Sequence, residues 1–303
     1  MRSFVAAFWI FAISFLAVAH GFAQEKKRVI TTTTILDDMV RNVAGVHVES
    51  ICLLKPGTDA HNYAPTPADA KAVAGADLVI TNGLQFEGWI DKLIENAGYQ
   101  GTVVAAAKGA TLIEEEHDHD EGHDHHHHGD TDPHVWQDLS NGIKMVEAIR
   151  DALVKLDAVH AADFKASADL YIAQLRAADG WVKKQFAAVP KASRKLVTSH
   201  DAFRYFGKAY GIELKAVAGL STEQEADAKH IAEVIQYVRE QKVKAVFVEN
   251  VSNPKMLDQI ASEAGVTVGG RLFSDSLAER DQPAGTYIGM FRSNVLTILS
   301  SMR

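Results

Sequence analysis

The chain has 303 residues, long enough for one large or two medium domains, and 47% of them are apolar. This apolar content supports a substantial core and excludes an intrinsically disordered protein. The formal net charge is -8. With no excess of basic residues, the chain is not expected to bind nucleic acid.

The first residues have the pattern of a secretory signal peptide. Arg2 precedes an apolar run from Phe4 to Ala19, and Gly21 and Ala23 have the small side chains that a signal peptidase needs before its cut. We predict residues 1–23 as a cleaved signal peptide. A membrane anchor is the weaker alternative, because about sixteen apolar residues fall short of the roughly twenty that span a bilayer.

The chain contains a single cysteine, Cys52, so an internal disulfide is impossible even in an oxidising compartment. No cysteine lies near the predicted cleavage site, which leaves no signal for lipid attachment. We therefore expect a soluble protein of a Gram-negative periplasm that draws its stability from its core.

Two regions alternate short β-branched or apolar runs with helical patterns, which is typical of α/β lobes around mostly parallel sheets. Residues 24–158 form the first, with runs near Val29, Leu54, Asp77 and Val103 separated by PADAKAVAGA and FEGWIDKLIENAG. Residues 190–303 form the second, with runs near Leu196, Leu214, Val246 and Val266 and helical patterns in AKHIAEVIQYVREQ and PKMLDQIASEAG.

An acidic, histidine-rich segment interrupts the first lobe. Residues 114–136 hold nine Asp or Glu and no Lys or Arg, so the remaining chain is nearly neutral. Because so polar a run cannot bury enough apolar surface to order itself, we predict a mobile loop over residues 114–131. Its imidazoles favour the capture of metal ions, Zn²⁺ above all, whereas the alternatives are an acidic linker or a tag. The histidines are His117, His119, His123, His125, His126, His127 and His128.

A long helical tract separates the two lobes. One helix is predicted from Asn141 to about Leu156 and a second from Ala161 to about Ala188, where Pro190 stops it. A helix of about 28 residues would be about 42 Å long. We predict residues 159–189 as one rigid linking helix, with two ordinary packed helices as the alternative.

Four residues outside the loop are candidate metal ligands with nearly even spacing. Successive separations are 73, 66 and 75 residues, and three of the four closely follow a strand-like run. Residues beyond the carboxyl ends of parallel strands face the crevice where open α/β sheets bind ligands. We therefore predict a site in the cleft between the lobes, with two ligands from each lobe. The candidates are His61, His134, His200 and Asp275.

Each candidate also has an ordinary structural interpretation. A lone histidine such as His61 is more often a satisfied polar group than a ligand. Asp201 would cap a helix over DAFRYFGKAY that begins at His200, and Asp275 alone would be a helix cap before SLAER. His134 is a stronger candidate, because a proline stiffens the preceding backbone and Trp136 could wall the site from water. The four together favour a metal site.

In this order, the motifs GTDAHNYAPTPAD, DPHVW after a histidine-rich loop, TSHDAFRYF and LFSDSL resemble the solute-binding proteins of zinc and manganese ABC importers. The similarity covers essentially the whole mature chain. It implies two α/β lobes joined by one long helix. It also implies that the metal lies between the lobes, held at the positions of His61, His134, His200 and Asp275.

The chain departs from that family in two places. Ala60 stands where the family usually has a proline before the histidine, so the local turn is expected to be looser, and NGLQFEGWIDKL differs from the usual glycine-rich segment. Neither change removes a ligand. His47, His160 and His230 match no site motif, and we predict that they are surface or cap residues.

Three imidazoles and one carboxylate make a closed tetrahedral set that suits Zn²⁺, whereas Mn²⁺ or Fe²⁺ would favour more oxygen. The resemblance points the same way. Manganese binders of the family generally carry a glutamate at the position of His200, and the histidine-rich loop is a feature of zinc members. A Mn²⁺- or Fe²⁺-binding protein of the same importer class is the alternative.

A zinc hydrolase and a periplasmic zinc buffer are the rivals from other classes. Catalytic zinc keeps a position open for water, which four protein ligands do not leave, and the chain has no HExxH motif. We predict that Glu249 is a structural partner near the cleft and not a catalytic base. A buffer does not need two lobes around one site. We therefore expect a monomeric, high-affinity zinc-binding protein, not an enzyme, that delivers its ion to an ABC permease with its cytoplasmic ATPase.

Overall fold

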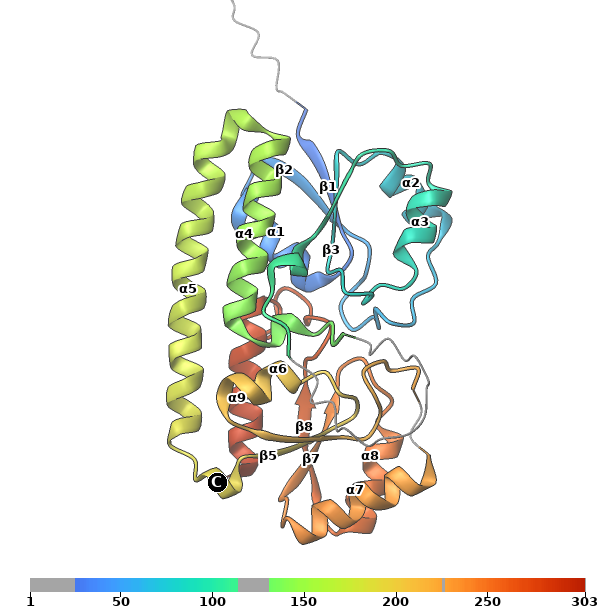
Figure 1. The fold of residues 1–303 in the computed structure, drawn as a ribbon, viewed down its shortest axis with the longest axis vertical. Helices are drawn as coiled ribbons and strands as arrows, with labels where there is room; N and C mark the ends of the chain where they lie inside the picture. Colours follow the sequence, from blue (N-terminus) through green and yellow to red (C-terminus); the bar gives the residue numbers. More distant parts are fainter. Residues whose placement is uncertain (1–24, 114–130, 225–226, 303) are drawn as a thin grey trace, which may run out of the picture.

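The computed structural model describes residues 25–113, 131–224 and 227–302. The predicted signal peptide and the seven histidines of the predicted loop lie outside these ranges. No helix within them is long and apolar enough to cross a membrane. The chain forms two α/β lobes, one above the other, with long helices along one side (Figure 1). The predicted fold class is thereby confirmed.

The first lobe is built on a parallel four-stranded sheet in the order β2-β1-β3-β4. Its register places Val29 beside Ser50 on one side and Leu78 on the other. Cys52, at the end of β2, is a free cysteine. The strands are β1 (Lys27–Thr31), β2 (Val48–Cys52), β3 (Leu78–Thr81) and β4 (Thr102–Ala105), and the helices are α1 (Thr34–Ala44), α2 (Pro67–Ala74) and α3 (Ile90–Asn96).

The second lobe repeats this winding, with a parallel sheet in the order β6-β5-β7-β8. The central strand β7 is buried at every position, as expected for a strand covered on both faces. The strands are β5 (Lys195–Thr198), β6 (Glu213–Ala216), β7 (Ala245–Glu249) and β8 (Thr267–Leu272), and the helices are α6 (Arg204–Tyr210), α7 (Ala228–Glu240) and α8 (Lys255–Ala264).

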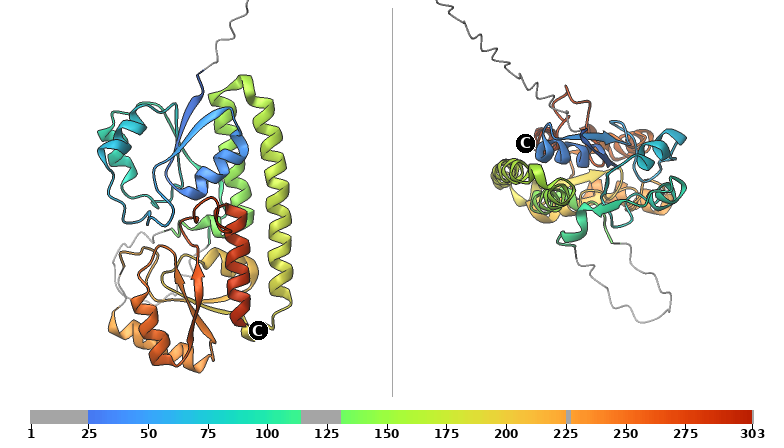
Figure 2. Two further views of the ribbon diagram at one scale, coloured as in Figure 1. Left: turned by 180° about the vertical axis from the view of Figure 1, so that it is seen from behind. Right: turned by 90° about the horizontal axis from the view of Figure 1, so that it is seen from above.

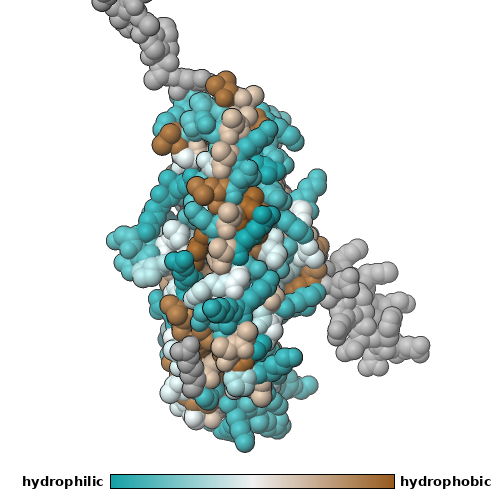
Figure 3. Space-filling model, turned by 90° about the vertical axis from the view of Figure 1, so that its left-hand side faces the viewer, coloured by the Kyte–Doolittle hydropathy of each residue, from teal (hydrophilic) through white to brown (hydrophobic). Residues whose placement is uncertain are grey.

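Three helices, α4 (Leu139–Leu156), α5 (Ala161–Ala187) and α9 (Tyr287–Met302), lie on one side of the molecule: α4 beside the first lobe, α9 beside the second, and α5 along both (Figure 2). Phe164, Ala168, Tyr171, Leu175 and Val182 recur at helical spacing on the buried side of α5. This face packs against α1 and α4 of the first lobe and against α9 and α6 of the second. With 27 residues, α5 is about 40 Å long and packs against both lobes. Its outer side is mainly hydrophilic, with scattered apolar side chains (Figure 3).

The helix predicted from His200 begins later than predicted, and the alternative interpretation of Asp275 as a helix cap does not hold. Helix α6 begins at Arg204 with Phe203 at its N-cap position, so Asp201 is not the cap. The Asp201 backbone N–H donates instead to the Gly219 carbonyl, which holds this segment outside the helix. The SLAER segment after Asp275 is not helical either, because it runs across to the first lobe and bonds to α1.

Candidate metal centre

The four predicted ligand residues come together between the lobes. One ligand atom from each lies within 4.8 Å of the others. His61 lies in the segment between β2 and α2, and His134 comes shortly before α4. His200 follows β5 by two residues, and Asp275 follows β8 by three. Each lobe therefore supplies two side chains.

The spacing of these atoms suits a single small cation. The Nε2 atoms of His61 and His134 are 3.3 Å apart, and His200 Nε2 lies 3.2 Å from Asp275 Oδ2. Asp275 is 3.6 Å from His61 Nε2 and 3.7 Å from His134 Nε2. A tetrahedrally held ion with bonds of about 2.0–2.1 Å separates its ligand atoms by about 3.3–3.4 Å. The group therefore needs little rearrangement to close on an ion.

The carboxylate of Asp275 is buried, so its negative charge is costly unless a positive charge lies close to it. The side chains of His134, His200 and Asp275 are buried, and that of His61 is only 8% exposed. Among the described residues the Asp275 oxygens face only the three imidazoles, the nearest being His200 Nε2 at 3.2 Å, and neither oxygen accepts a hydrogen bond of good geometry. A buried carboxylate without well-formed hydrogen bonds is costly, and a cation bound between it and the imidazoles would offset that cost.

Burial and neighbouring charges shift the pKa values of His61, His200 and Asp275 in different directions. Burial lowers the pKa of His61 to about 4. Burial alone would also lower the pKa of His200, but the Glu249 and Asp275 carboxylates together raise it well above its usual value. Burial would raise the pKa of Asp275, but the neighbouring histidines hold it below its usual value. Without an ion, a proton on His200 therefore partly neutralises the site.

Two further carboxylates orient the imidazoles from behind. Asp132 Oδ1 lies 2.8 Å from His134 Nδ1, and Glu249 Oε2 lies 2.5 Å from His200 Nδ1. A carboxylate at Nδ1 fixes the proton there and turns the Nε2 lone pair toward the ion. Glu249 thus has the structural place that the sequence predicted. Asp132 was not predicted.

A repeated Asp-x-His pattern in the sequence could have indicated that Asp132 supports His134. In both DAH and DPH, the first residue accepts the backbone N–H of the histidine: His61 donates to Asp59 at 2.9 Å, and His134 donates to Asp132 at 3.0 Å. The turn at Ala60 is further held by Trp89 Nε1, which donates to the Ala60 carbonyl at 2.8 Å. These bonds hold the turn although the proline usual in the family is absent.

Two aromatic rings wall the site. Phe86 lies edge-on to His61, with ring centroids 4.7 Å apart, and Trp136 lies edge-on to His134 at 5.3 Å. Both rings are buried. Trp136 Nε1 also donates to the Ser274 carbonyl at 2.9 Å, immediately before Asp275. Trp136 therefore excludes water and fixes a ligand loop of the other lobe at the same time.

The remaining described histidines lie outside this group. His47 and His160 stack on each other, with ring centroids 4.1 Å apart, and each has an aspartate nearby, Asp163 and Asp157 respectively. His230 lies in the first turn of α7, where its N–H donates to the capping Asp227.

Replacing Glu249 with glutamine tests the support behind His200. The amide cannot hold the Nδ1 proton as a carboxylate does, so we expect metal affinity to fall about 10- to 100-fold. Glu213→Gln, at an exposed carboxylate of the same lobe, should keep the wild-type value. Competition titration against a chelator measures both variants. Unchanged affinity in Glu249→Gln would contradict a role in orienting His200.

Comparison with known proteins identifies the family. Residues 29–301 match the model of the ZnuA family, described as zinc-uptake complex component A, periplasmic. The chain belongs to this family. It is therefore a metal-binding solute-binding protein of an ABC metal importer and not an enzyme. Members of the family act outside the cytoplasm together with an ABC permease and its ATPase.

The relatives of this ZnuA-family chain are named for different metals. The manganese-binding lipoprotein MntA of Bacillus subtilis is 35% identical over 287 residues, which is 93% of this chain and 91% of MntA. The iron-binding protein YfeA of Yersinia pestis is 33% identical, over 97% of this chain and 94% of YfeA. The periplasmic zinc-binding protein TroA of Treponema pallidum superposes with a TM-score of 0.85 at 31% identity, over 91% of this chain and 99% of TroA. The relatives therefore show that the chain is a metal-binding protein of this importer class, but their names do not agree on which metal is bound.

Proposed function

We propose that this protein is a high-affinity zinc-binding protein that passes Zn²⁺ to an ABC permease in the inner membrane. The observation that carries the proposal is the convergence of three imidazole Nε2 atoms, two of them from fully buried histidines, on one buried carboxylate. A donor set dominated by imidazole nitrogen suits zinc better than manganese or magnesium. We further propose that the signal peptide is cleaved and that the mature protein works as a soluble periplasmic monomer.

Manganese or iron is the second candidate, and the orientation of Asp275 favours it. Its Oδ1 faces His134 at 3.7 Å, while its Oδ2 faces His61 at 3.6 Å and His200 at 3.2 Å. A carboxylate so placed can bind through both oxygens, which would give five donor atoms and more oxygen character. The names of MntA and YfeA support the same candidate.

Growth under metal limitation separates the two candidates, whereas affinity alone does not, because an N/O site binds Zn²⁺ more tightly than Mn²⁺ as a rule. We expect a strain lacking this protein to grow poorly when zinc is scarce and to recover with added zinc. The untagged protein purified from the periplasm should carry about one zinc per chain. Recovery with manganese alone, and manganese in the purified protein, would contradict the zinc proposal.

Delivery to a permease explains the two-lobed design better than buffering does. Because each lobe contributes two ligands, a bound ion fixes the relative orientation of the lobes, and a permease can recognise that orientation. Helix α5 packs on both lobes, so we expect a modest tilt on release and not a wide hinge movement. A buffer would keep zinc uptake intact when the protein is removed, whereas a delivery protein would not.

We propose that the histidine-rich loop collects ions for the cleft. A segment composed almost entirely of His, Asp and Glu is expected to lose entropy each time it closes on an ion, so its sites should be weaker than the site in the cleft. Deleting residues 117–128 should leave one tight zinc per molecule and remove the weaker ones. Isothermal titration of the deletion variant measures both classes. Loss of the tight event with survival of the weak ones would place the primary site in the loop.

A further inference from the structure

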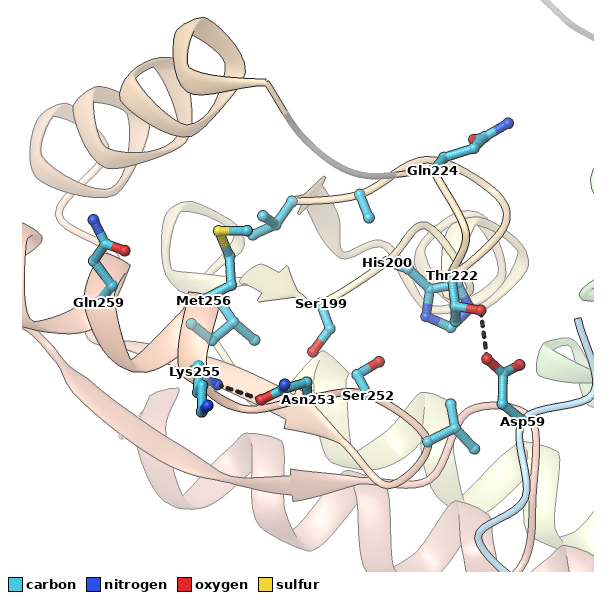
Figure 4. A pocket seen from close by; sticks show the side chains of 14 residues that line it. Asp59, Ser199, His200, Thr222, Gln224, Ser252, Asn253, Lys255, Met256 and Gln259 are labelled. Atoms are coloured by element: carbon cyan, nitrogen blue, oxygen red, sulfur yellow. Dashed lines mark hydrogen bonds between the residues drawn. The ribbon is translucent and has the colours of Figure 1, made fainter. Parts of the chain in front are cut away.

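The two lobes are bonded to each other at separate places around the ion site. At one of them, α1 holds the segment that follows β8. Leu277 N donates to Thr34 Oγ1 at 2.8 Å, and Arg280 pairs with Asp37 at 2.8 Å. In addition, the Thr222 hydroxyl donates to Asp59 Oδ2 at 2.6 Å across the lobe boundary (Figure 4). The first contact joins α1 to a long segment, whereas the second depends on one side-chain pair.

Asp59 connects this interlobe bond directly to a candidate ligand. Its Oδ1 accepts the backbone N–H of His61 at 2.9 Å while its Oδ2 accepts the Thr222 hydroxyl. The equivalent Asp132 differs, because its Oδ1 receives both the backbone N–H and the ring of its own histidine. Asp59 therefore ties the position of His61 to the second lobe through its carboxylate, whereas Asp132 meets the second lobe mainly through its backbone carbonyl, which accepts the Tyr205 hydroxyl at 3.0 Å.

A cavity of about 490 Å³, lined by both polar and apolar side chains, adjoins this contact. Asp59, Thr222 and His200 line one end of it, and Figure 4 shows Thr222 and Asp59 meeting in front of the His200 ring. Ser199 and Ser252 add hydroxyl groups to the wall, and Lys255 lies at the end away from Asp59. Hydroxyl oxygens can replace part of the hydration shell of a passing cation. The Asp59–Thr222 bond thus lies at the end of the cavity that also reaches the ligand His200.

We propose that the Asp59–Thr222 hydrogen bond is a latch on the ion site, and that the ion leaves into the adjoining cavity when the latch opens. The inference rests on the proposed function, since it requires that His61 and its three partners hold the ion. Opening the latch releases Asp59, and with it the backbone of His61, from Thr222, while Gly57 N stays bonded to Ser276 Oγ at 2.8 Å. The latch acts on the rate of exchange and contributes no ligand.

Thr222→Val removes the hydroxyl donor while keeping the shape of the side chain and leaving Asp59 on His61. We expect the protein to release zinc about five-fold faster, the effect of one net hydrogen bond. Thr222→Ser restores the donor and should release zinc at nearly the wild-type rate. Ser221→Ala, in the same loop, is the matched control, because within the described part of the chain the Ser221 hydroxyl has one hydrogen bond, which it accepts from Glu223 N. Stopped-flow mixing of the zinc-loaded protein with an excess of a chromogenic chelator measures each rate.

The outcomes separate the latch from a structural role and from the proposed function. Wild-type release in Thr222→Val, or equal acceleration in Ser221→Ala, would overturn the latch while leaving the ion site intact. A lower melting temperature of metal-free Thr222→Val with unchanged release would also overturn it. If the wild-type protein bound no zinc at the four residues, the proposed function would fail first, and the release experiment would then show no slowly released, tightly bound zinc in any variant.

Discussion

Alanine at Asp275 is expected to weaken zinc binding at least about tenfold, or roughly 1.4 kcal/mol. The substitution removes the buried charge that balances the ion and admits water to its place. Alanine at His61, His134 or His200 should each have an effect of at least the same size, because each removes one metal bond from a closed set. Competition titration of zinc against a chelator measures all four variants.

His230→Ala is the matched control for these substitutions, since it removes an imidazole of the second lobe that lies outside the site. Its zinc affinity should equal that of the wild type. Wild-type affinity in two of the four ligand variants would show that the ion is held elsewhere.

Zinc affinity is expected to fall about tenfold for each unit by which the pH drops, between about pH 7 and pH 5. Zinc needs a neutral His200, whose pKa is raised well above its usual value, so His200 carries a proton in this window and the ion must expel it. His61, with a pKa of about 4, is already neutral there. Asp275, whose pKa is lowered, is already ionised. One proton should therefore leave for each zinc bound.

Isothermal titration in buffers of different ionisation enthalpy counts that proton directly. We expect about one proton released per zinc at neutral pH, and His200→Ala should abolish the release along with much of the affinity. An affinity that is flat across the window, or a proton count near zero, would mean that His200 is neutral before zinc arrives.

The sequence predicted the features that depend on local pattern. Alternating strands and helices indicated the two parallel sheets, and the apolar spacing in α5 indicated a helix that reaches both lobes. Residues just beyond strand ends, such as His200 after β5 and Asp275 after β8, were singled out because such ends meet at one edge of a sheet. Family resemblance assigned the same residues.

Features that depend on long-range contacts could not be predicted. Helix α1 was missed because the run of threonines before it favours a strand, although Thr33 caps the helix in the structure. The helix predicted from His200 starts later, because Asp201 is bonded to Gly219 and not to the helix. The bond between Asp59 and Thr222 joins residues 163 positions apart, and no local pattern announces such a pair.

Anomalous diffraction from a crystal of the zinc-loaded protein tests the central claim most directly. Data collected above and below the zinc absorption edge locate the ion without assumptions about its ligands. We expect one strong peak between the lobes, bonded at about 2.0–2.2 Å to the Nε2 atoms of His61, His134 and His200 and to the Asp275 carboxylate. A peak that lies elsewhere, or that misses two of these four residues, would contradict the assignment.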